Sequence, residues 1–306
     1  MVHNLRFGII TIQNTPWQAL LDQWRLLESM GCWDSLWVAD HFVHPYAPQE
    51  PWLEGWTALA ALASHTSRVR VGALVTNIAL RNPAMLARQA LTIDHISGGR
   101  LNLGLGSGQP GDIGYAMLGE DDWPNAERVS RFREAVEIID GMLSHETFDY
   151  HGRYYHVDNA VTSPRPIQSP RPPITIAALG PTMLRITARH ADTWNTYPGK
   201  GVTPAEALTF ISDRNKLLDD LCAEIGRDPG TLSRSLLSLR ADTTSPFASV
   251  GAFEDHVGKY REAGLNEFIF YHPPGLWYKE TGPEQDAVFE QVASEVIPAM
   301  KAAAAL

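Results

Sequence analysis

The chain has 306 residues, of which 44% are hydrophobic and 20% charged, a balance typical of a globular protein with a sizeable core. Its formal net charge is −10 and Lys and Arg never cluster in runs longer than two, so we expect no nucleic-acid partner and no membrane partner. The N-terminus shows no signal-peptide pattern, and Cys32 and Cys222 lie far apart without metal-ligand spacing. These features predict a cytoplasmic protein without a metal site.

Short runs rich in Val, Ile and Leu alternate with longer segments of helical periodicity, which is the pattern of βα units. In chain order, strands are predicted at 5–12, 35–40, 69–75, 100–106, 173–178, 192–197, 236–242 and 267–272. Helices are predicted at 16–30, 55–66, 83–97, 126–146, 181–190, 204–225, 250–263 and 283–304. Pro83 and Pro204 stand at first helical positions, and Gly31 and Gly264 stand where helices should end.

Eight strands, each followed by a helix, favour a single (β/α)8 TIM barrel spanning residues 1–306 over an open sheet. Two connections are too long for plain loops. Residues 107–125 are rich in glycine and acidic side chains, and residues 147–172 contain "FDYHGRYYHVDN", which has the pattern of a β-hairpin. Long insertions commonly serve as lids or binding loops, so we expect both at the C-terminal rim of the barrel.

Polar and glycine residues follow three of the predicted strands, at the ends where TIM barrels carry their active sites. Asp40 and His41 end the second strand, although a lone histidine there could equally be a hydrogen-bonded loop residue. Ser107, Gly108 and Gln109 follow the fourth strand, in a glycine cluster that lets backbone approach a ligand but lacks the G-x-G-x-x-G spacing.

The fifth strand runs into Ala178, Leu179 and Gly180, and Pro181 opens the next helix. Backbone amides at a helix N-terminus can hold a phosphate without any lysine. An ordinary βα turn is the alternative interpretation of the same residues.

Four segments together resemble the bacterial luciferase-like superfamily of flavin and deazaflavin oxidoreductases. They are "WVADHF" (37–42), residues 71–108 with "DHISGGR" and "GLGSG", "YHGRYY" (150–155) and "ITIAALGPTMLRITARHADTWN" (174–195). Asp-His-Phe and Ala-Leu-Gly-Pro are most similar to the branch that uses coenzyme F420. The resemblance implies that His41 contacts the reactive ring together with Ser107 and Gly108, and that Ala178 to Pro181 bind the phosphate.

The resemblance also implies a non-proline cis peptide near Leu74 and Val75 that supports the ring. One position departs from the sugar-phosphate dehydrogenases of this branch, because Gln109 stands where they carry a glutamate proposed as a proton donor. An amide cannot deliver that proton, so Gln109 would orient a carbonyl, imine or alcohol instead. His41 can exchange a proton near neutral pH, and Asp40 either fixes the His41 tautomer or holds the loop.

The favoured function is therefore hydride transfer between F420 and a small-molecule substrate. An FMN-dependent monooxygenase and a non-catalytic binding protein are the alternatives. Candidate cationic partners for the acidic F420 tail are Arg81, Arg165 and Lys200. We also expect a homodimer, to which the apolar "WTALAALA" segment could contribute a face, although core burial would explain that segment as well.

Overall fold

The structure, a computed structural model, describes residues 4–239, 241–273 and 283–305. The chain divides into two compact units, each assembled from separate stretches. Unit 1 comprises Met1–Ile12, Leu26–Leu36 and Ala177–Leu306, and unit 2 comprises Gln13–Arg25 and Trp37–Ile176. The single domain expected over residues 1–306 stays a prediction.

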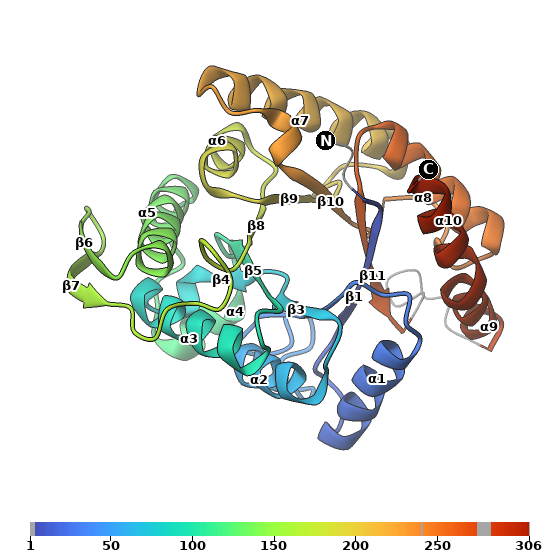
Figure 1. The fold of residues 1–306 in the computed structure, drawn as a ribbon, viewed down its shortest axis with the longest axis horizontal. Helices are drawn as coiled ribbons and strands as arrows, with labels where there is room; N and C mark the ends of the chain where they lie inside the picture. Colours follow the sequence, from blue (N-terminus) through green and yellow to red (C-terminus); the bar gives the residue numbers. More distant parts are fainter. Residues whose placement is uncertain (1–3, 240, 274–282, 306) are drawn as a thin grey trace. The chain divides into compact units, whose positions relative to one another are not determined.

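Unit 1 contains four neighbouring parallel strands, with β1 (Arg6–Thr11) beside β11 (Glu267–His272), β11 beside β10 (Ser233–Leu237) and β10 beside β9 (Thr193–Thr196) (Figure 1). Its core is aromatic, because Phe7, Phe253, Phe268 and Phe270 are all buried and pack ring against ring. The elements wholly in this unit are β1 (Arg6–Thr11), α6 (Pro181–His190), β9 (Thr193–Thr196), α7 (Pro204–Glu224), the 3-10 turn η2 (Pro229–Thr231), β10 (Ser233–Leu237), α8 (Val250–Glu262), β11 (Glu267–His272), α9 (Pro283–Gln291), the π-helical turn η3 (Val292–Val296) and α10 (Ile297–Ala304).

Unit 2 centres on β5 (Leu101–Gly106), which pairs in parallel with β3 (Arg70–Ala73), β4 (Thr76–Asn77) and β8 (Ile174–Ala177). Helices and a hairpin follow these strands in the chain, and α1 (Trp17–Ser29), β2 (Ser35–Val38) and β8 each divide between the two units. The remaining elements of this unit are α2 (Gly55–His65), the 3-10 turn η1 (Ile78–Leu80), α3 (Pro83–Ile96), α4 (Ile113–Leu118), α5 (Asn125–Ser144), β6 (Thr147–His151) and β7 (His156–Val161).

The strand order of the main sheet is β3-β2-β1-β11-β10-β9-β8-β5-β4, and β3 pairs with β5 in addition. Apart from the two-residue β4, these are the eight predicted strands, each followed in the chain by a helix, and the β3–β5 pairing closes their order. The predicted (β/α)8 TIM barrel is confirmed. Pro83 and Pro204 do open helices, and Gly31 and Gly264 have positive φ angles just beyond helix ends.

Most elements agree with their predicted bounds within two residues, and two differ more clearly. The seventh strand lies at Ser233–Leu237 rather than 236–242, of which residue 240 lies outside the described chain. Arg234, near the start of this strand, is buried, and its guanidinium donates hydrogen bonds to Asn215, to Asp219 and to nearby carbonyls. The last helix is interrupted by η3, directly before Pro298, whose missing N–H and bulky ring disfavour a regular helical turn.

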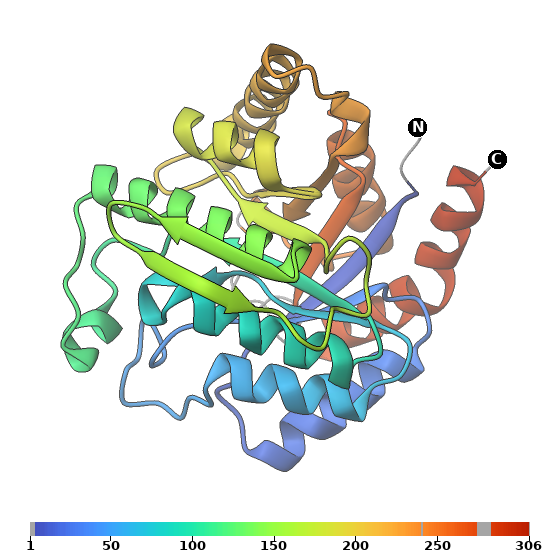
Figure 2. The ribbon, with the colours of Figure 1, turned by 60° about the vertical axis from the view of Figure 1, so that its left-hand side comes forward.

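The hairpin expected in residues 147–172 is present as β6 and β7, which lie along α5 (Figure 2). Its position differs from the expected C-terminal rim. The segment joins a helix to a strand, and Gln168 donates to the Leu101 carbonyl at the start of β5 and accepts from Arg70 at the start of β3. The part of the insertion around Gln168 therefore lies at the N-terminal ends of the strands. Of the two insertions, only residues 107–125 follow the C-terminal end of a strand.

The "DHISGGR" motif is structural. The buried Asp94 carboxylate accepts from the backbone amides of Ile167 and Gln168, and Arg100 donates to carbonyls of Ala63, Thr66 and Val69. The motif thus ties the second insertion and the end of α2 to the start of β5. It contributes no side chain to the strand ends that carry the candidate site.

The apolar "WTALAALA" segment forms most of α2, and its large residues face the interior. Trp56, Leu59 and Leu62 are at most 3% exposed. Core burial, rather than a dimer face, accounts for the apolar character of this segment. No helix in the described part of the chain combines the length and apolarity needed to cross a membrane.

Candidate active site

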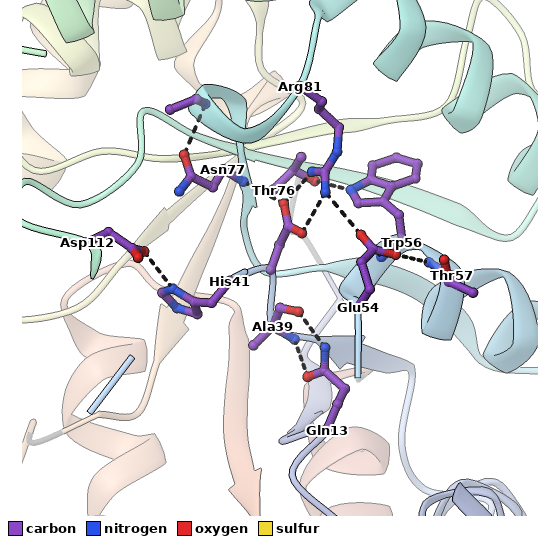
Figure 3. Close-up of polar contacts among 12 residues, drawn as sticks. Gln13, Ala39, His41, Glu54, Trp56, Thr57, Thr76, Asn77, Arg81 and Asp112 are labelled. Atoms are coloured by element: carbon purple, nitrogen blue, oxygen red, sulfur yellow. Dashed lines mark hydrogen bonds and ion pairs between the residues drawn. The ribbon is translucent and has the colours of Figure 1, made fainter. Parts of the chain in front are cut away.

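The backbone directly after β2 is held in place by hydrogen bonds from a side chain. The fully buried Gln13 side chain donates to the Ala39 carbonyl at 2.6 Å and accepts from the Ala39 amide at 3.0 Å (Figure 3). A side-chain amide can satisfy both backbone groups of one residue in this way, as a neighbouring strand would. Ala39 is therefore fixed, and the directions of Asp40 and His41 follow from it.

Asp40 turns inward and binds an arginine. Its carboxylate is 1% exposed and accepts two hydrogen bonds from Arg81, at 2.5 and 2.9 Å, and one from the Asn77 amide at 2.9 Å. Arg81 also reaches Glu54 at 3.2 Å (Figure 3). Burial alone would lower the pKa of Arg81, but these carboxylates outweigh it and raise that pKa. Of the two roles considered for Asp40, these contacts favour holding the loop, because none of them involves His41.

His41 lies beside a different carboxylate. Its Nδ1 is 3.0 Å from Oδ2 of Asp112, whose side chain is 3% exposed, while the imidazole itself is 26% exposed (Figure 3). Trp52 donates from Nε1 to the His41 carbonyl at 2.8 Å and sets its ring edgewise to the imidazole. The loop backbone and the ring are therefore both held.

Asp112 is the site residue that the sequence reasoning missed. It is the N-cap of α4, and its Oδ1 accepts from the Gly114 amide at 2.8 Å. An aspartate just before a short apolar run is a recognised helix start, so the sequence "GDIGYAML" contained the signal for the helix. The pairing with His41, 71 positions away, has no such local signal.

The peptide bond between Leu74 and Val75 is cis, as the resemblance implied. Leu74 is buried, and its amide donates to the Val38 carbonyl at 2.9 Å. Gly106 at the end of β5 lies directly against this bond, since a Cβ there would be 2.3 Å from a Val75 methyl. Only glycine fits at that position, so the ends of β3 and β5 are in close contact.

The glycine-rich stretch after β5 is anchored by a buried arginine. Arg128, 2% exposed, donates to the Ser107 carbonyl at 3.3 Å, to the Tyr115 hydroxyl at 3.1 Å and to Asp122 at 2.5 Å. Gln109 is exposed, and within the described chain only its backbone carbonyl is hydrogen-bonded, to the Asp112 amide at 3.3 Å. The Gln109 side chain is therefore available to a ligand.

The loop after β8 belongs to unit 1. Ala178 is held by its amide, which donates to the Asn195 carbonyl at 3.1 Å, and by its own carbonyl, which accepts from Trp194. Gly180 and Pro181 are exposed at the N-terminus of α6, which has no side-chain cap. The first amides of a helix without such a cap suit an anion. Phosphate binding by Ala178, Leu179, Gly180 and Pro181 stays a prediction.

Two of the three cations considered for an acidic cofactor tail already have partners in the protein. Arg81 binds Asp40 and Glu54, and Arg165 donates to the carbonyls of Leu143 and His145. Within the described residues there is no group of three or more His, Cys, Asp or Glu side chains that could hold a metal ion.

A (β/α)8 barrel with an accessible histidine, a buried carboxylate beside it and a cis peptide at neighbouring strand ends is the architecture of an enzyme for small molecules. Comparison with known proteins gives the family. The chain belongs to the luciferase-like monooxygenase family, whose family model matches residues 4–245.

A relative from Amycolatopsis mediterranei, named F420-dependent glucose-6-phosphate dehydrogenase, is 27% identical over 88% of this chain and 90% of its own. Two solved structures share the fold at 18% identity. The F420-dependent tetrahydromethanopterin reductase from Methanopyrus kandleri has a TM-score of 0.75 over 97% of this chain and 99% of its own. An F420-dependent secondary alcohol dehydrogenase, solved with an F420-acetone adduct, has a TM-score of 0.76 over 96% of this chain and 100% of its own.

Proposed function

We propose that this chain is a coenzyme F420-dependent oxidoreductase that transfers a hydride between the deazaflavin and a small organic substrate. The observation that carries the proposal is the match to an F420-dependent relative along 88% of the chain, together with His41 and a cis peptide at neighbouring strand ends. An FMN-dependent monooxygenase, which the family name also covers, is the alternative.

The described residues fit such a cofactor in two places. In unit 2, the cis peptide of Leu74 and Val75, with Ser107 and Gly108, would support the ring, because Gly106 lets the Val75 side chain pack directly against the end of β5. In unit 1, the exposed N-terminus of α6 at Ala178 to Pro181 would bind the phosphate through backbone amides. When bound, F420 supplies a hydride acceptor or donor, which is the chemistry that side chains lack.

The protein's part is then to orient the substrate and exchange one proton. When an alcohol is oxidised, its C–H bond breaks and the hydride leaves with both electrons, while the hydroxyl proton passes to His41. Reduction of a carbonyl runs the same exchange in reverse. Gln109, which is exposed and whose side chain is hydrogen-bonded by no described residue, would hydrogen-bond the substrate oxygen, and Asp40 would keep the loop in place through Arg81.

Cofactor choice is tested by calorimetry of the apoprotein with F420 and, separately, with FMN. We expect binding of F420 and none of FMN. Binding of FMN without F420 would transfer the assignment to the monooxygenase. The cytoplasmic location and the homodimer stay proposals, and a monomer mass in sedimentation well above micromolar concentration would reject the dimer.

The role of His41 is tested by single-turnover hydride transfer. His41→Ala should lower the rate by about 10²-fold, the usual effect of a positioned acid or base, while F420 affinity changes little. His44→Asn is the matched control, because His44 lies in the same loop and accepts from the amides of Tyr46 and Ala47, which an asparagine can also do. It also controls for the loss of an aromatic ring from this loop, since the His44 ring contacts Tyr46 and Trp52. If His41→Asn stayed within about threefold of the parent rate, His41 would be a binding residue only.

A further inference from the structure

We propose that Asp112 is a positioning residue that fixes the tautomer of His41, so that Nδ1 carries the hydrogen and Nε2 is the atom that exchanges a proton with substrate. This inference rests on the proposed function. It gives Asp112, which lies outside every motif of the family resemblance, a part in the reaction.

The Asp112 carboxylate has both oxygens engaged. Oδ1 accepts from the Gly114 amide at 2.8 Å, and Oδ2 lies 3.0 Å from Nδ1 of His41. Burial alone would raise the pKa of Asp112, but the hydrogen bonds from His41 and Gly114 and the charge of Arg128 outweigh it, so the pKa is lowered. Asp112 is therefore ionised at neutral pH, and an ionised carboxylate only accepts. The hydrogen between the two groups must belong to Nδ1.

The other ring nitrogen of His41 is left for substrate. No hydrogen bond from residues 4–239, 241–273 or 283–305 reaches Nε2, and the ring is 26% exposed. In a neutral imidazole one nitrogen donates and the other accepts, and the hydrogen bond made by one nitrogen decides which. With Nδ1–H directed at Asp112, Nε2 has the lone pair that can take a hydroxyl proton.

Asp112 also supplies a carboxylate near the position where the resembling dehydrogenases have theirs. Gln109 stands in place of that glutamate. The Asp112 amide donates to the Gln109 carbonyl at 3.3 Å, so the two residues lie in one turn. The carboxylate three positions further on acts through His41 and contacts no substrate itself. The hydroxyl proton moves to Nε2, the Nδ1–H stays bound to Asp112, and the charge of the resulting imidazolium is balanced by the carboxylate.

The test is nitrogen NMR of the apoprotein, which reports the His41 tautomer without any cofactor. The His41 signals are assigned by their loss in His41→Gln. In the parent protein at neutral pH we expect the hydrogen on Nδ1. In Asp112→Asn the amide oxygen must still face the Gly114 N–H, so the NH₂ group faces His41 and the hydrogen should move to Nε2. Asp121→Asn, an exposed carboxylate in the same insertion, should leave the tautomer unchanged.

Single-turnover hydride transfer adds the functional readout. Asp112→Asn should lower the rate by about 10²-fold with F420 affinity nearly unchanged, while Asp121→Asn keeps the parent rate. A parent His41 with its hydrogen on Nε2, or an unchanged tautomer in Asp112→Asn, would overturn the proposal, as would an unaffected rate in that variant. Failure of F420 to bind the parent protein would instead refute the proposed function, and the NMR result would still decide the tautomer.

Discussion

Gly108 offers the sharpest test of how the insertion after β5 is held. Its φ angle is +81°, and a Cβ would lie 2.4 Å from both the Asn77 Oδ1 and the Tyr115 hydroxyl and 3.0 Å from the Arg128 guanidinium. The left-handed backbone costs an L-residue about 1 kcal/mol. The three buried side chains are also hydrogen-bonded to one another, so making room adds about 1–3 kcal/mol. Gly108→Ala should therefore lower the free energy of unfolding by roughly 2–4 kcal/mol.

Gly111→Ala is the matched control. Gly111 lies in the same insertion with a φ angle of +76°, but a Cβ there would have no atom within 4 Å. It should lose only the backbone contribution, about 1 kcal/mol, in the same urea titration. Equal losses for the two variants would show that the side chains around Gly108 yield freely, and the rigid anchoring of the insertion by Arg128 would be refuted.

Two further predictions concern charge. Asp40→Asn should lower the free energy of unfolding by about 3 kcal/mol, because it leaves the mostly buried Arg81 without its main partner. Glu54, the other partner of Arg81, is half-exposed, so Glu54→Gln should lower the free energy of unfolding by less than about 1 kcal/mol in urea titrations. Burial lowers the pKa of His272 from 6.5 to about 4, against the opposing charge of Asp286. Between these values the unfolded chain binds a proton that the folded chain does not, so stability should fall as pH drops through this window, by up to about 1.4 kcal/mol per pH unit. His272→Phe should have a flatter dependence, and an equal slope in urea titrations at pH 7, 6 and 5 would contradict this origin.

The order of strands and helices was readable because βα units carry strong local signals. The predicted helix bounds agree with the structure within two residues, because proline and glycine mark several of the helix ends directly. The seventh strand was displaced because Ser233, Arg234 and Ser235 do not look like a buried strand. The Arg234 guanidinium is bound by residues from α7 and its following turn, and Ser235 accepts from Asn195 of β9. No local pattern reveals such partners.

The candidate site could be predicted in part. Strand ends gave Asp40, His41, Ser107 and Gln109, because the barrel places its site there. Their pairing could not be predicted, since adjacency in sequence suggested that Asp40 would serve His41. In the structure the two side chains diverge, and Asp40 binds Arg81 while His41 binds Asp112. Long-range partners of this kind depend on how the loops fold, which periodicity does not encode.

A second histidine of this chain shows why a carboxylate partner alone does not make a site. His256 on α8 binds Asp242 through Nδ1 and Ser238 through Nε2, at 2.9 Å, an arrangement of the same three residue types as a hydrolytic triad. The ring is 2% exposed, and burial lowers the pKa of His256 despite the carboxylate. Both nitrogens are occupied within the protein, so the group fastens the end of β10 to α8. His41 has one nitrogen bound by Asp112, and no described residue is hydrogen-bonded to the other, so the proposed proton exchange falls to His41 and not to His256.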